Sequence, residues 1–318
     1  MAHSRPSVPL SSAQEDTSGP QHRIGADWLR TSGGEKRGYI DPLRLRELWF
    51  HTGTACNLRC PDCFEHSAPG DQRLEPLLFD EAKCFIDEAV ALGIEQFSFT
   101  GGEPFVARDL VRILDYALEF RPCLVLTNGT SPLRTRLDQV RPLRDKPNAL
   151  SFRVSLDYSD PDRHDAGRGD GMFDLALDSL VKLHQAGFRV SVARRHEDDE
   201  DPNAITDAYR ALLSAKGLPV DTPIVAFPDL ERTGSPEITE NCMTTYHSPE
   251  SCGRFMCAFS RMVVKQGGCM RVYACTLVDD NPHYDLGSSL AATARTRVRL
   301  EHPRCFACFA TGASCSEL

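Results

Sequence analysis

Long hydrophobic runs are missing from this sequence of 318 residues. A transmembrane helix needs about 20 consecutive apolar residues, and no segment approaches that length. The N-terminus also lacks the short apolar core of a secretory signal peptide. We therefore expect a cytoplasmic protein that has no membrane partner.

The chain also lacks an excess of positive charge. It carries 36 Lys and Arg against 45 Asp and Glu, which gives a formal net charge of −9. General nucleic-acid binders normally present a basic surface. The local basic cluster Arg194-Arg195-His196 is too short to reverse this balance, so we expect no nucleic-acid partner.

Cysteine is the residue type that is abundant. The chain has 13 cysteines, an odd number, and their spacing is uneven. A secreted disulfide framework normally has an even number of cysteines, so this pattern fits one poorly. In a reducing compartment such cysteines are better explained as thiols, many of which ligate metal.

Residues 1–40 are rich in Ser, Pro, Gly and charge, and we expect a flexible N-terminal extension there. From Leu45 onward, strands and helices alternate. The predicted strands are Leu48–His51, Phe97–Thr100, Leu124–Thr127, Leu150–Leu156, Phe188–Ala193 and Pro223–Phe227.

Helical patterns fill the gaps between these strands. Asp80 can cap a helix whose apolar positions, Ala82, Phe85, Ile86 and Ala89, recur at helical spacing. Six successive β/α units predict an α/β fold with a parallel sheet wrapped by helices. Six units are too few for a complete eight-stranded barrel, so we expect a partial (β/α)6 barrel of the TIM type over residues 41–228.

The pattern breaks near Asp229, and residues 229–318 are predicted to form a separate small cysteine-rich module. Its short strands include Met262–Lys265 and Val272–Ala274. Cys257 and Cys275 flank this predicted hairpin, and Cys305 and Cys308 form a later close pair. Two ligands from a hairpin and a later pair can form a closed four-cysteine site, either for an iron–sulfur cluster or for structural zinc.

A second set of thiols follows the first predicted strand. Cys56, Cys60 and Cys63 are spaced C-x3-C-x2-C. Three thiolates suit a [4Fe–4S] cluster with one iron left open, because such clusters normally take four cysteines. The triplet alone could also be part of a zinc site, although zinc motifs usually come as two pairs.

The other predicted strands also end in residues that suit a site. The second ends in Gly101-Gly102-Glu103-Pro104, the third in Asn128-Gly129, and the fourth near Ser155 and Asp157. The fifth ends in Arg194-Arg195-His196. Each stretch alone can be a turn or a cap. Parallel strands place all their carboxyl ends at one edge, so together they predict a functional site beside the triplet.

This combination resembles the radical SAM superfamily. The resemblance implies that Cys56, Cys60 and Cys63 ligate a [4Fe–4S] cluster and that S-adenosylmethionine (SAM) binds its open iron. It further implies that Gly101, Gly102 and Glu103 meet the amino group of the methionine part. Ser155 and Arg194 are candidates to hold the SAM ribose or carboxylate, and Asn128 is another. Further similarity lies in His164-Asp165 and Arg168-Gly169. One residue departs from the family pattern, because Asp62 stands where an aromatic residue is usual before the third cysteine.

The C-terminal cysteines resemble the twitch type of auxiliary-cluster module, since the longer SPASM type needs more cysteine pairs. By this resemblance Cys257, Cys275, Cys305 and Cys308 hold a second, fully ligated [4Fe–4S] cluster. Cys242, Cys252, Cys269 and Cys315 lie within the same module, so any of them could replace an assigned ligand. Cys84 and Cys123 are most simply small buried hydrophobic residues.

The resemblance implies an oxidoreductase or transferase that cleaves SAM reductively to a 5′-deoxyadenosyl radical, which abstracts hydrogen from the substrate. By the same resemblance the second cluster accepts an electron from the substrate, which gives net oxidation. Asp157 and Arg194 are the catalytic candidates, and Arg195 and His196 could also accept a proton. A reductant such as flavodoxin or ferredoxin is implied as electron donor.

The substrate is less determined than the chemistry. Only about 44 residues precede the first predicted strand, so a folded leader-peptide recognition domain does not fit there, which favours a small molecule. The alternative is a radical SAM enzyme that epimerises or cross-links a ribosomal peptide through C–C or C–S bonds. From a different class, a zinc-binding interaction protein on an α/β scaffold would leave the strand-end loops unexplained.

Overall fold

The structure is a computed structural model that describes residues 26–196, 200–230, 234–312 and 315–317. Its centre is a curved sheet of eight strands in the order β7-β6-β5-β4-β3-β2-β8-β9. Within the described residues, no helix is both long and apolar enough to cross a bilayer.

Six parallel strands follow one another in chain order across this sheet. They are β2 (Glu47–His51), β3 (Gln96–Thr100), β4 (Cys123–Thr127), β5 (Leu150–Ser155), β6 (Arg189–Arg195) and β7 (Ile224–Phe227). Each lies within two residues of a strand expected from the sequence. The α/β fold with a predominantly parallel sheet is therefore confirmed.

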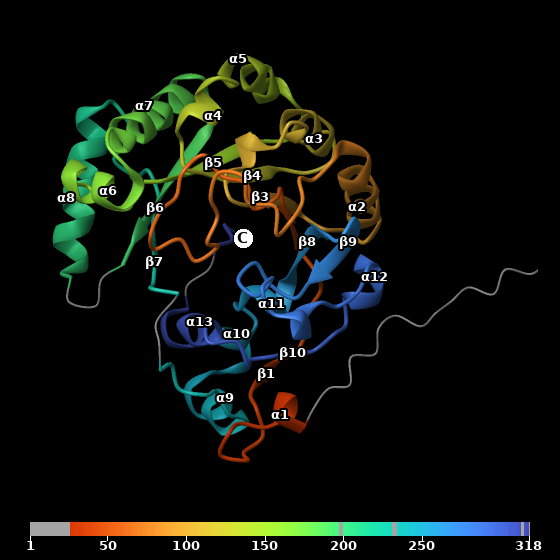
Figure 1. Ribbon diagram of the computed structural model, residues 1–318. Helices are drawn as coiled ribbons and strands as arrows, with labels where there is room; N and C mark the ends of the chain where they lie inside the picture. The colour runs from red at the N-terminus through yellow and green to blue at the C-terminus, as the bar shows by residue number, and fades with distance from the viewer. Residues whose placement is uncertain (1–25, 197–199, 231–233, 313–314, 318) are drawn as a thin grey trace, which may run out of the picture.

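Helices cover the convex outer face of the sheet, as Figure 1 shows. The longer ones are α2 (Phe79–Ala91), α3 (Leu110–Ala117), α7 (Met172–Gln185) and α8 (Pro202–Ala215), and the shorter ones are α4 (Ser131–Arg134), α5 (Leu137–Val140) and α6 (Pro161–Arg168). Short 3-10 turns lie at Pro104–Val106, Arg141–Asp145 and Pro282–Tyr284. The apolar side of α2 packs into the main core, where Ile86 and Ala89 are fully buried. Removing such apolar faces from water holds the helices to the sheet.

The predicted C-terminal module is not separate from the barrel. The hairpin of β8 (Ser260–Gln266) and β9 (Cys269–Tyr273) extends the sheet, with β8 parallel to β2 and β9 antiparallel to β8. The two-residue turn has Gly267 and Gly268 at φ 59° and 75°, a region that favours glycine. Pairing with β8 satisfies an edge of β2 that would otherwise be open.

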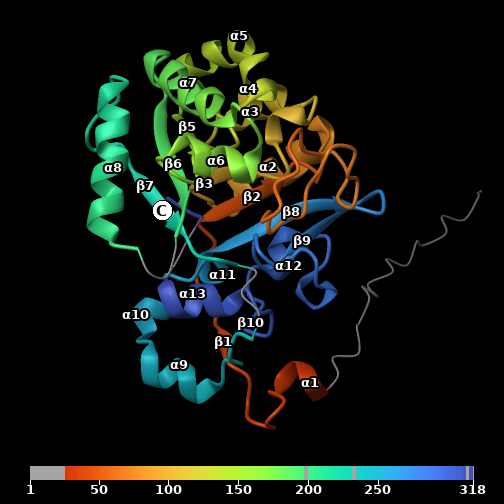
Figure 2. The ribbon, with the colours of Figure 1, turned by 60° about the vertical axis from the view of Figure 1, so that its left-hand side comes forward.

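The remaining C-terminal elements form a layer below the barrel, which Figure 2 shows from the side. They are α9 (Glu240–Tyr246), α10 (Pro249–Cys252), α11 (Met256–Phe259), β10 (Val298–Arg299) and α13 (Cys305–Thr311). Helix α12 (Leu290–Thr293) lies against α2 instead, and its Leu290 is buried in the main core. A second apolar cluster holds this layer to the inner side of the sheet, with Trp49 and Met262 fully buried in it.

The N-terminal segment differs from the prediction of a flexible extension up to residue 40. Helix α1 spans Ala26–Leu29, and β1 (Tyr39–Ile40) pairs with β10 in a small antiparallel sheet. Ile40 is 1% exposed, so burial of its side chain in the lower layer fixes this stretch. The rest of the predicted extension, residues 1–25, lies outside the described residues.

The end of the chain returns to the open centre of the curved sheet, where Figure 1 marks it. Arg153 on β5 is 2% exposed, and its Nη1 donates to the carbonyl oxygen of Cys315 at 2.7 Å. Its Nη2 lies 2.8 Å from Glu317 Oε1, which also accepts from Ser191 Oγ at 2.9 Å. Residues 315–317 thus cover the inner face of β5 and β6.

Candidate active site

A cavity of about 530 Å³ opens at the carboxyl ends of the parallel strands. Nine of the residues predicted from the sequence line it together: Cys56, Cys60, Cys63, Gly101, Gly102, Asn128, Ser155, Asp157 and Arg194. They come from the ends of β2 to β6, and the parallel order of these strands gathers them at one edge. The expected strand-end site is therefore one continuous space.

The three cysteines lie in the loop that follows β2. Cys56 Sγ accepts the backbone N–H of Leu58 at 3.4 Å and lies 3.8 Å from the side-chain nitrogen of Asn128. Burial raises the pKa of Cys56 to about 11 and also raises the pKa of Cys60. Buried thiols of this kind lose their protons when they bind a metal.

Asn128 ties the cysteine loop to the end of β4. Its side-chain nitrogen donates to Asn57 Oδ1 at 3.0 Å, and its Oδ1 accepts the Thr130 hydroxyl at 2.7 Å. Asn57 donates in turn to Thr130 Oγ1 at 2.9 Å. These bonds use much of the Asn128 amide, so its clearest structural effect is to position the loop.

The two glycines after β3 lie directly on the backbone that follows β2. A Cβ on Gly102 would lie 2.5 Å from the carbonyl oxygen of Ala55, and one on Gly101 would lie 2.6 Å from Thr52 Oγ1. Gly101 also has a φ of 148°. No side chain fits at either position, because the loop after β3 is packed against the strand that leads into the cysteines.

The Glu103 carboxylate faces protein donors and does not line the cavity. Glu103 is 1% exposed, and its oxygens accept the N–H of Asn128 at 2.7 Å, the N–H of Phe105 at 3.1 Å and the Thr127 hydroxyl at 2.8 Å. This differs from the expectation of a carboxylate turned toward a ligand ammonium. Its position joins the glycine loop to the end of β4.

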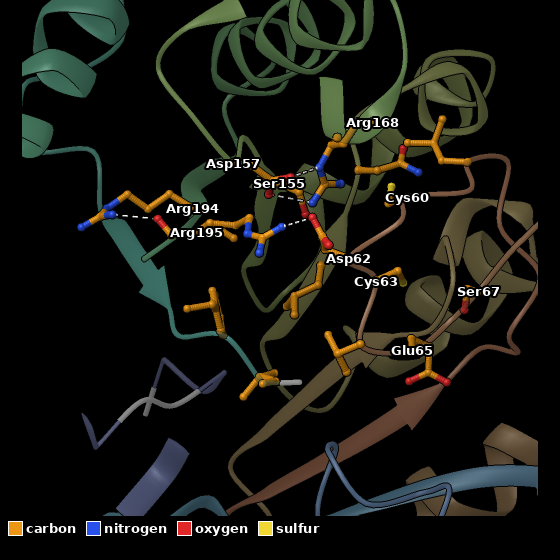
Figure 3. A pocket seen from close by; sticks show the side chains of 18 of the residues that line it. Cys60, Asp62, Cys63, Glu65, Ser67, Ser155, Asp157, Arg168, Arg194 and Arg195 are labelled. Atoms are coloured by element: carbon orange, nitrogen blue, oxygen red, sulfur yellow. Dashed lines mark hydrogen bonds and ion pairs between the residues drawn. The ribbon is translucent and has the colours of Figure 1, made fainter. Parts of the chain in front are cut away.

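Asp157 lies against Arg168, as Figure 3 shows. Arg168 Nε and Nη2 donate to the two carboxylate oxygens at 2.5 and 2.8 Å. Burial alone raises the pKa of Asp157, but the Arg168 guanidinium outweighs it and leaves this pKa below its usual value. A carboxylate held ionised in this way is a weak proton acceptor.

Arg168 is a site residue that the sequence did not assign. It is the last residue of α6 and lines the cavity. Burial lowers the pKa of Arg168, but Asp157 outweighs burial and raises it. Cys60 and Cys63 raise this pKa further, which places the Arg168 charge beside the cysteine loop. The signal for it was the Arg168-Gly169 pair, noted only as part of the family resemblance. Its bidentate contact with Asp157 depends on how α6 folds back, and no spacing rule gives that.

Two further arginines lie at the end of β6. Arg194 is 6% exposed, with Nη1 2.6 Å from Glu200 Oε1 and 2.8 Å from the carbonyl oxygen of Arg195. Arg195 Nη1 lies 2.5 Å from Asp62 Oδ2, an ion pair between two cavity-lining residues that Figure 3 marks with a dashed line. Asp62, the residue that departs from the family pattern, therefore links the cysteine loop to β6.

The four C-terminal cysteines predicted as one set also lie together. Cys257, Cys275, Cys305 and Cys308 all line a small, mainly apolar cavity of about 30 Å³ below the barrel. Burial raises the pKa of each of these thiols. Tyr284 places its hydroxyl 3.7 Å from Cys305 Sγ.

Arg261 is a buried cation next to this set. It is fully buried, and within the described residues it donates to backbone carbonyls, those of Cys257, Ser260, Thr293 and Thr296. Among the ion pairs of the described residues none includes Arg261, and its pKa is raised by Cys257 and Cys275 against a larger lowering from burial. A buried positive charge that has no carboxylate partner is suited to a neighbouring site that becomes anionic when its cysteines bind a metal centre.

The other cysteines are not part of either set of lining thiols. Cys315 is 8% exposed and lines the large cavity, but it also lies near the C-terminal set, because burial raises its pKa to about 12 with a further contribution from Cys275. Cys242 contacts the Thr239 hydroxyl at the start of α9, and Cys252 ends α10. Cys123 is buried as expected, but Cys84 is exposed on α2, which corrects the expectation of a buried hydrophobic residue.

The spacing of the thiols bears on the zinc alternative. A tetrahedral zinc ion with Zn–S bonds near 2.3 Å holds its sulfurs about 3.8 Å apart. Over the described ranges, the one group of three or more His, Cys, Asp and Glu ligand atoms that all lie within 4.8 Å of one another contains no cysteine. The thiols of both sets thus lie further apart in the structure than that spacing, and their number and type suit the larger iron–sulfur cube.

Comparison with known proteins agrees with this site. The family model of the Radical SAM superfamily matches residues 50–207, which include the cysteine loop and the strand-end residues. The chain belongs to the radical SAM superfamily and is an enzyme, and this superfamily uses a [4Fe–4S] cluster and SAM.

Relatives of several kinds share this part of the chain. The mycofactocin maturase MftC of Mycolicibacterium smegmatis is 31% identical over 185 residues, which are 56% of this chain and 45% of that protein. The GTP 3′,8-cyclase of Marinobacter nauticus is 31% identical over 159 residues, 47% of this chain and 46% of that protein. The chain thus matches a little under half the length of these curated relatives.

A solved structure extends the similarity beyond the barrel. Streptococcus suis SuiB bound to S-adenosylmethionine superposes with a TM-score of 0.61 at 12% identity, over 80% of this chain and 67% of that one. At this identity the likeness shows the fold alone. The described chain therefore shares its fold with SuiB.

Proposed function

We propose that Cys56, Cys60 and Cys63 hold a [4Fe–4S] cluster that binds SAM in the large cavity. When bound, these cofactors supply a 5′-deoxyadenosyl radical that removes a hydrogen atom from the substrate. The observation that carries the proposal is that three thiols of one loop face the same cavity as the loops after β3 to β6. A three-thiol donor set leaves one iron free for SAM.

The residues around the cysteines have separate tasks in this proposal. Gly101 and Gly102 bring main chain close to the SAM methionine part, and Glu103 anchors their loop from below. Ser155 and Arg194, which line the same cavity, hold the ribose or the carboxylate. Asp157 keeps Arg168 beside the cysteine loop, a positioning task that replaces the expected role of proton acceptor.

A second [4Fe–4S] cluster at Cys257, Cys275, Cys305 and Cys308 completes the proposed enzyme. Its four thiols close the coordination, so it does not take substrate through an iron. When bound, it supplies an acceptor for the electron left on the substrate, while a proton leaves to solvent or to a side chain. The Arg261 guanidinium stabilises the negative charge of a four-thiolate cluster there.

For the substrate, we place the peptide first and reverse the preference for a small molecule. MftC is named as a maturase, and SuiB is known in complex with the precursor peptide SuiA. A small-molecule substrate is the second candidate, favoured by the relative that is named as a GTP 3′,8-cyclase. Peptides encoded beside this gene are the first substrates to test.

The test of the proposed cofactors is anaerobic reconstitution with iron and sulfide. We expect about eight irons per chain from two four-iron clusters, and 5′-deoxyadenosine formation with SAM and a strong reductant. Cys60→Ala should lose about half of the iron and all of the 5′-deoxyadenosine. Cys308→Ala should keep the SAM-cleaving cluster.

The zinc-binding alternative makes the opposite prediction. A protein that is isolated with stoichiometric zinc, stays colourless after reconstitution and leaves SAM intact would contradict the proposed function.

A further inference from the structure

Three buried ionisable side chains lie beside the active-site cavity and have no part in the function proposed so far. They are His51 at the end of β2, Glu65 just after the cysteine loop and Asp279 after β9, and they are 1%, 7% and 6% exposed. Their ligand atoms all lie within 4.8 Å of one another. Glu65 also lines the large cavity.

Acceptor atoms with few or no partners gather at this place. Asp279 Oδ1 is buried and has no hydrogen-bond partner within the described chain, and buried Glu65 Oε1 has only a long contact of 3.3 Å with His51 Nε2 and a more distant one with Arg73. The hydroxyls of Ser67 and Thr276, two cavity-lining residues that are 4% and 5% exposed, also have no hydrogen-bond partner within the described chain. Figure 3 shows Glu65 and Ser67 on one side of Cys63, away from Arg168. Buried polar atoms are nearly always paired, so such a group indicates a ligand that provides donors.

A metal ion is a poor candidate for that ligand because of the His51 tautomer. His51 Nδ1 accepts the backbone N–H of Gly53 at 3.2 Å, so in the neutral ring the hydrogen is on Nε2. Nε2 lies 3.3 Å from Glu65 Oε1. A metal would need the lone pair of Nε2, and ligating histidines normally donate from their other nitrogen instead of accepting there.

The charge at this place is negative. Two carboxylates are buried together with one histidine. Burial lowers the pKa of His51, but Glu65 and Asp279 outweigh it and raise this pKa, so His51 can offset only one of the two negative charges. The nearest guanidinium is that of Arg73, whose Nη2 lies 3.9 Å from Glu65 Oε1 but 3.0 Å from Asp71 Oδ2. Asp71 thus already offsets the charge of Arg73. Buried carboxylates require a cationic partner, and the cavity is the side from which one can reach Glu65.

We propose that this part of the cavity binds the protonated primary amino group of the substrate. An ammonium group has three donors and no acceptor, which matches the Glu65 carboxylate and the hydroxyls of Ser67 and Thr276. Asp279 adds negative charge from behind. The inference rests on the proposed function only in taking the cavity as the substrate site, and it names the substrate class as a primary amine, such as a lysine side chain or a free amino terminus.

The test compares two probes of similar shape in the reconstituted full chain saturated with SAM. 4-Fluorobenzylammonium carries the charge and 4-fluorobenzyl alcohol does not, and ¹⁹F NMR follows the binding of each. Saturation with SAM prevents the SAM amino group from competing as an explanation. We expect the ammonium probe to bind at least about tenfold more tightly than the alcohol.

Variants show which residue causes the preference for the ammonium probe. Glu65→Gln keeps the shape but removes the charge, and it should bring the two probes to within about twofold. Asp62→Asn is the matched control, because Asp62 also lines the cavity but is paired with Arg195. It should leave the preference for the ammonium probe intact. If Glu65→Gln does not fold, Asp279→Asn and the wild-type comparison still test the proposal.

Three results would overturn this inference: equal affinity of the wild type for both probes, an ammonium preference that survives in Glu65→Gln, or stoichiometric Zn²⁺ or Mn²⁺ that is lost in Asp279→Asn. None of them depends on turnover. Failure of SAM cleavage in the wild type would contradict the proposed function, while the probe comparison would still report on the amine site.

Discussion

At the scale of single residues, the contacts of the charged side chains decide their roles. Asp157 and Asp62 are both carboxylates that line the cavity, and each is paired with an arginine. The Asp157–Arg168 side chains are 16% and 18% exposed, whereas those of Asp62 and Arg195 are 61% and 35% exposed. Water screens the Asp62–Arg195 pair but not the Asp157–Arg168 pair. The two ion pairs therefore contribute differently to the free energy of unfolding.

A double-mutant cycle measures that difference. Asp157→Asn should lower the free energy of unfolding by about 2–4 kcal/mol, because it leaves the Arg168 guanidinium half-buried and unpaired. The double variant Asp157→Asn with Arg168→Gln should recover part of that loss. The measurement is anaerobic urea unfolding of the reconstituted chain.

Asp62→Asn serves as the control in the same measurement and should cost less than about 1 kcal/mol. Equal losses for Asp157→Asn and Asp62→Asn would show that burial of the Arg168 pair adds nothing.

At the scale of elements, periodicity predicted where helices and strands lie but not how their ends are held. The apolar positions Ala82, Phe85, Ile86 and Ala89 face the core as the spacing predicts. The helix cap was wrong, because Asp80 lies inside α2. The first N–H of α2, that of Phe79, donates instead to Asp109 Oδ2 at 3.1 Å, from a residue 30 positions later. A local rule cannot find a cap that comes from another element.

Substitution of both aspartates tests which one supports the helix. Asp109→Ala should lower the free energy of unfolding by about 1 kcal/mol, since it removes an acceptor from a helix N-terminus. Asp80→Ala should change it by only a few tenths of a kcal/mol. The check is thermal or urea unfolding of both variants, and a larger loss for Asp80→Ala would contradict this account.

The site shows the same division between local and distant information. Cys56, Cys60 and Cys63 were predicted because their spacing is local, and the strand-end residues because parallel strands share an edge. The group formed by His51, Glu65 and Asp279 was not predicted, because it joins positions more than 200 residues apart. The hairpin that brings Asp279 there pairs with β2, and sequence patterns do not specify the partner of a strand.

At the scale of the whole molecule, the C-terminal residues belong to the barrel. The buried Arg153 on β5 donates to the carbonyl oxygen of Cys315 and to the carboxylate of Glu317. These contacts, together with the β8–β9 hairpin, unite the two parts that the sequence predicts as separate domains. The predicted boundary near residue 229 therefore does not mark an independent unit in the structure.

Removing the Glu317 carboxylate tests the importance of this contact. Glu317→Ala should lower the free energy of unfolding by about 1–3 kcal/mol, because the buried guanidinium of Arg153 loses its only anionic partner within the described residues. Glu250→Ala is the matched control, since its side chain is 88% exposed, and it should change stability by less than about 0.5 kcal/mol. Equal stability of the two variants in urea unfolding would contradict a structural role for the tail.

The return of the chain end to the barrel also sets an order of events during synthesis. Arg153 and Glu317 are 164 positions apart, so their contact forms only after the segment between them has been synthesised. Until then the inner face of β5 and β6 is uncovered, and the cysteine loop after β2 is already made. We expect this face to stay exposed to solvent in that interval, before residues 315–317 dock on it.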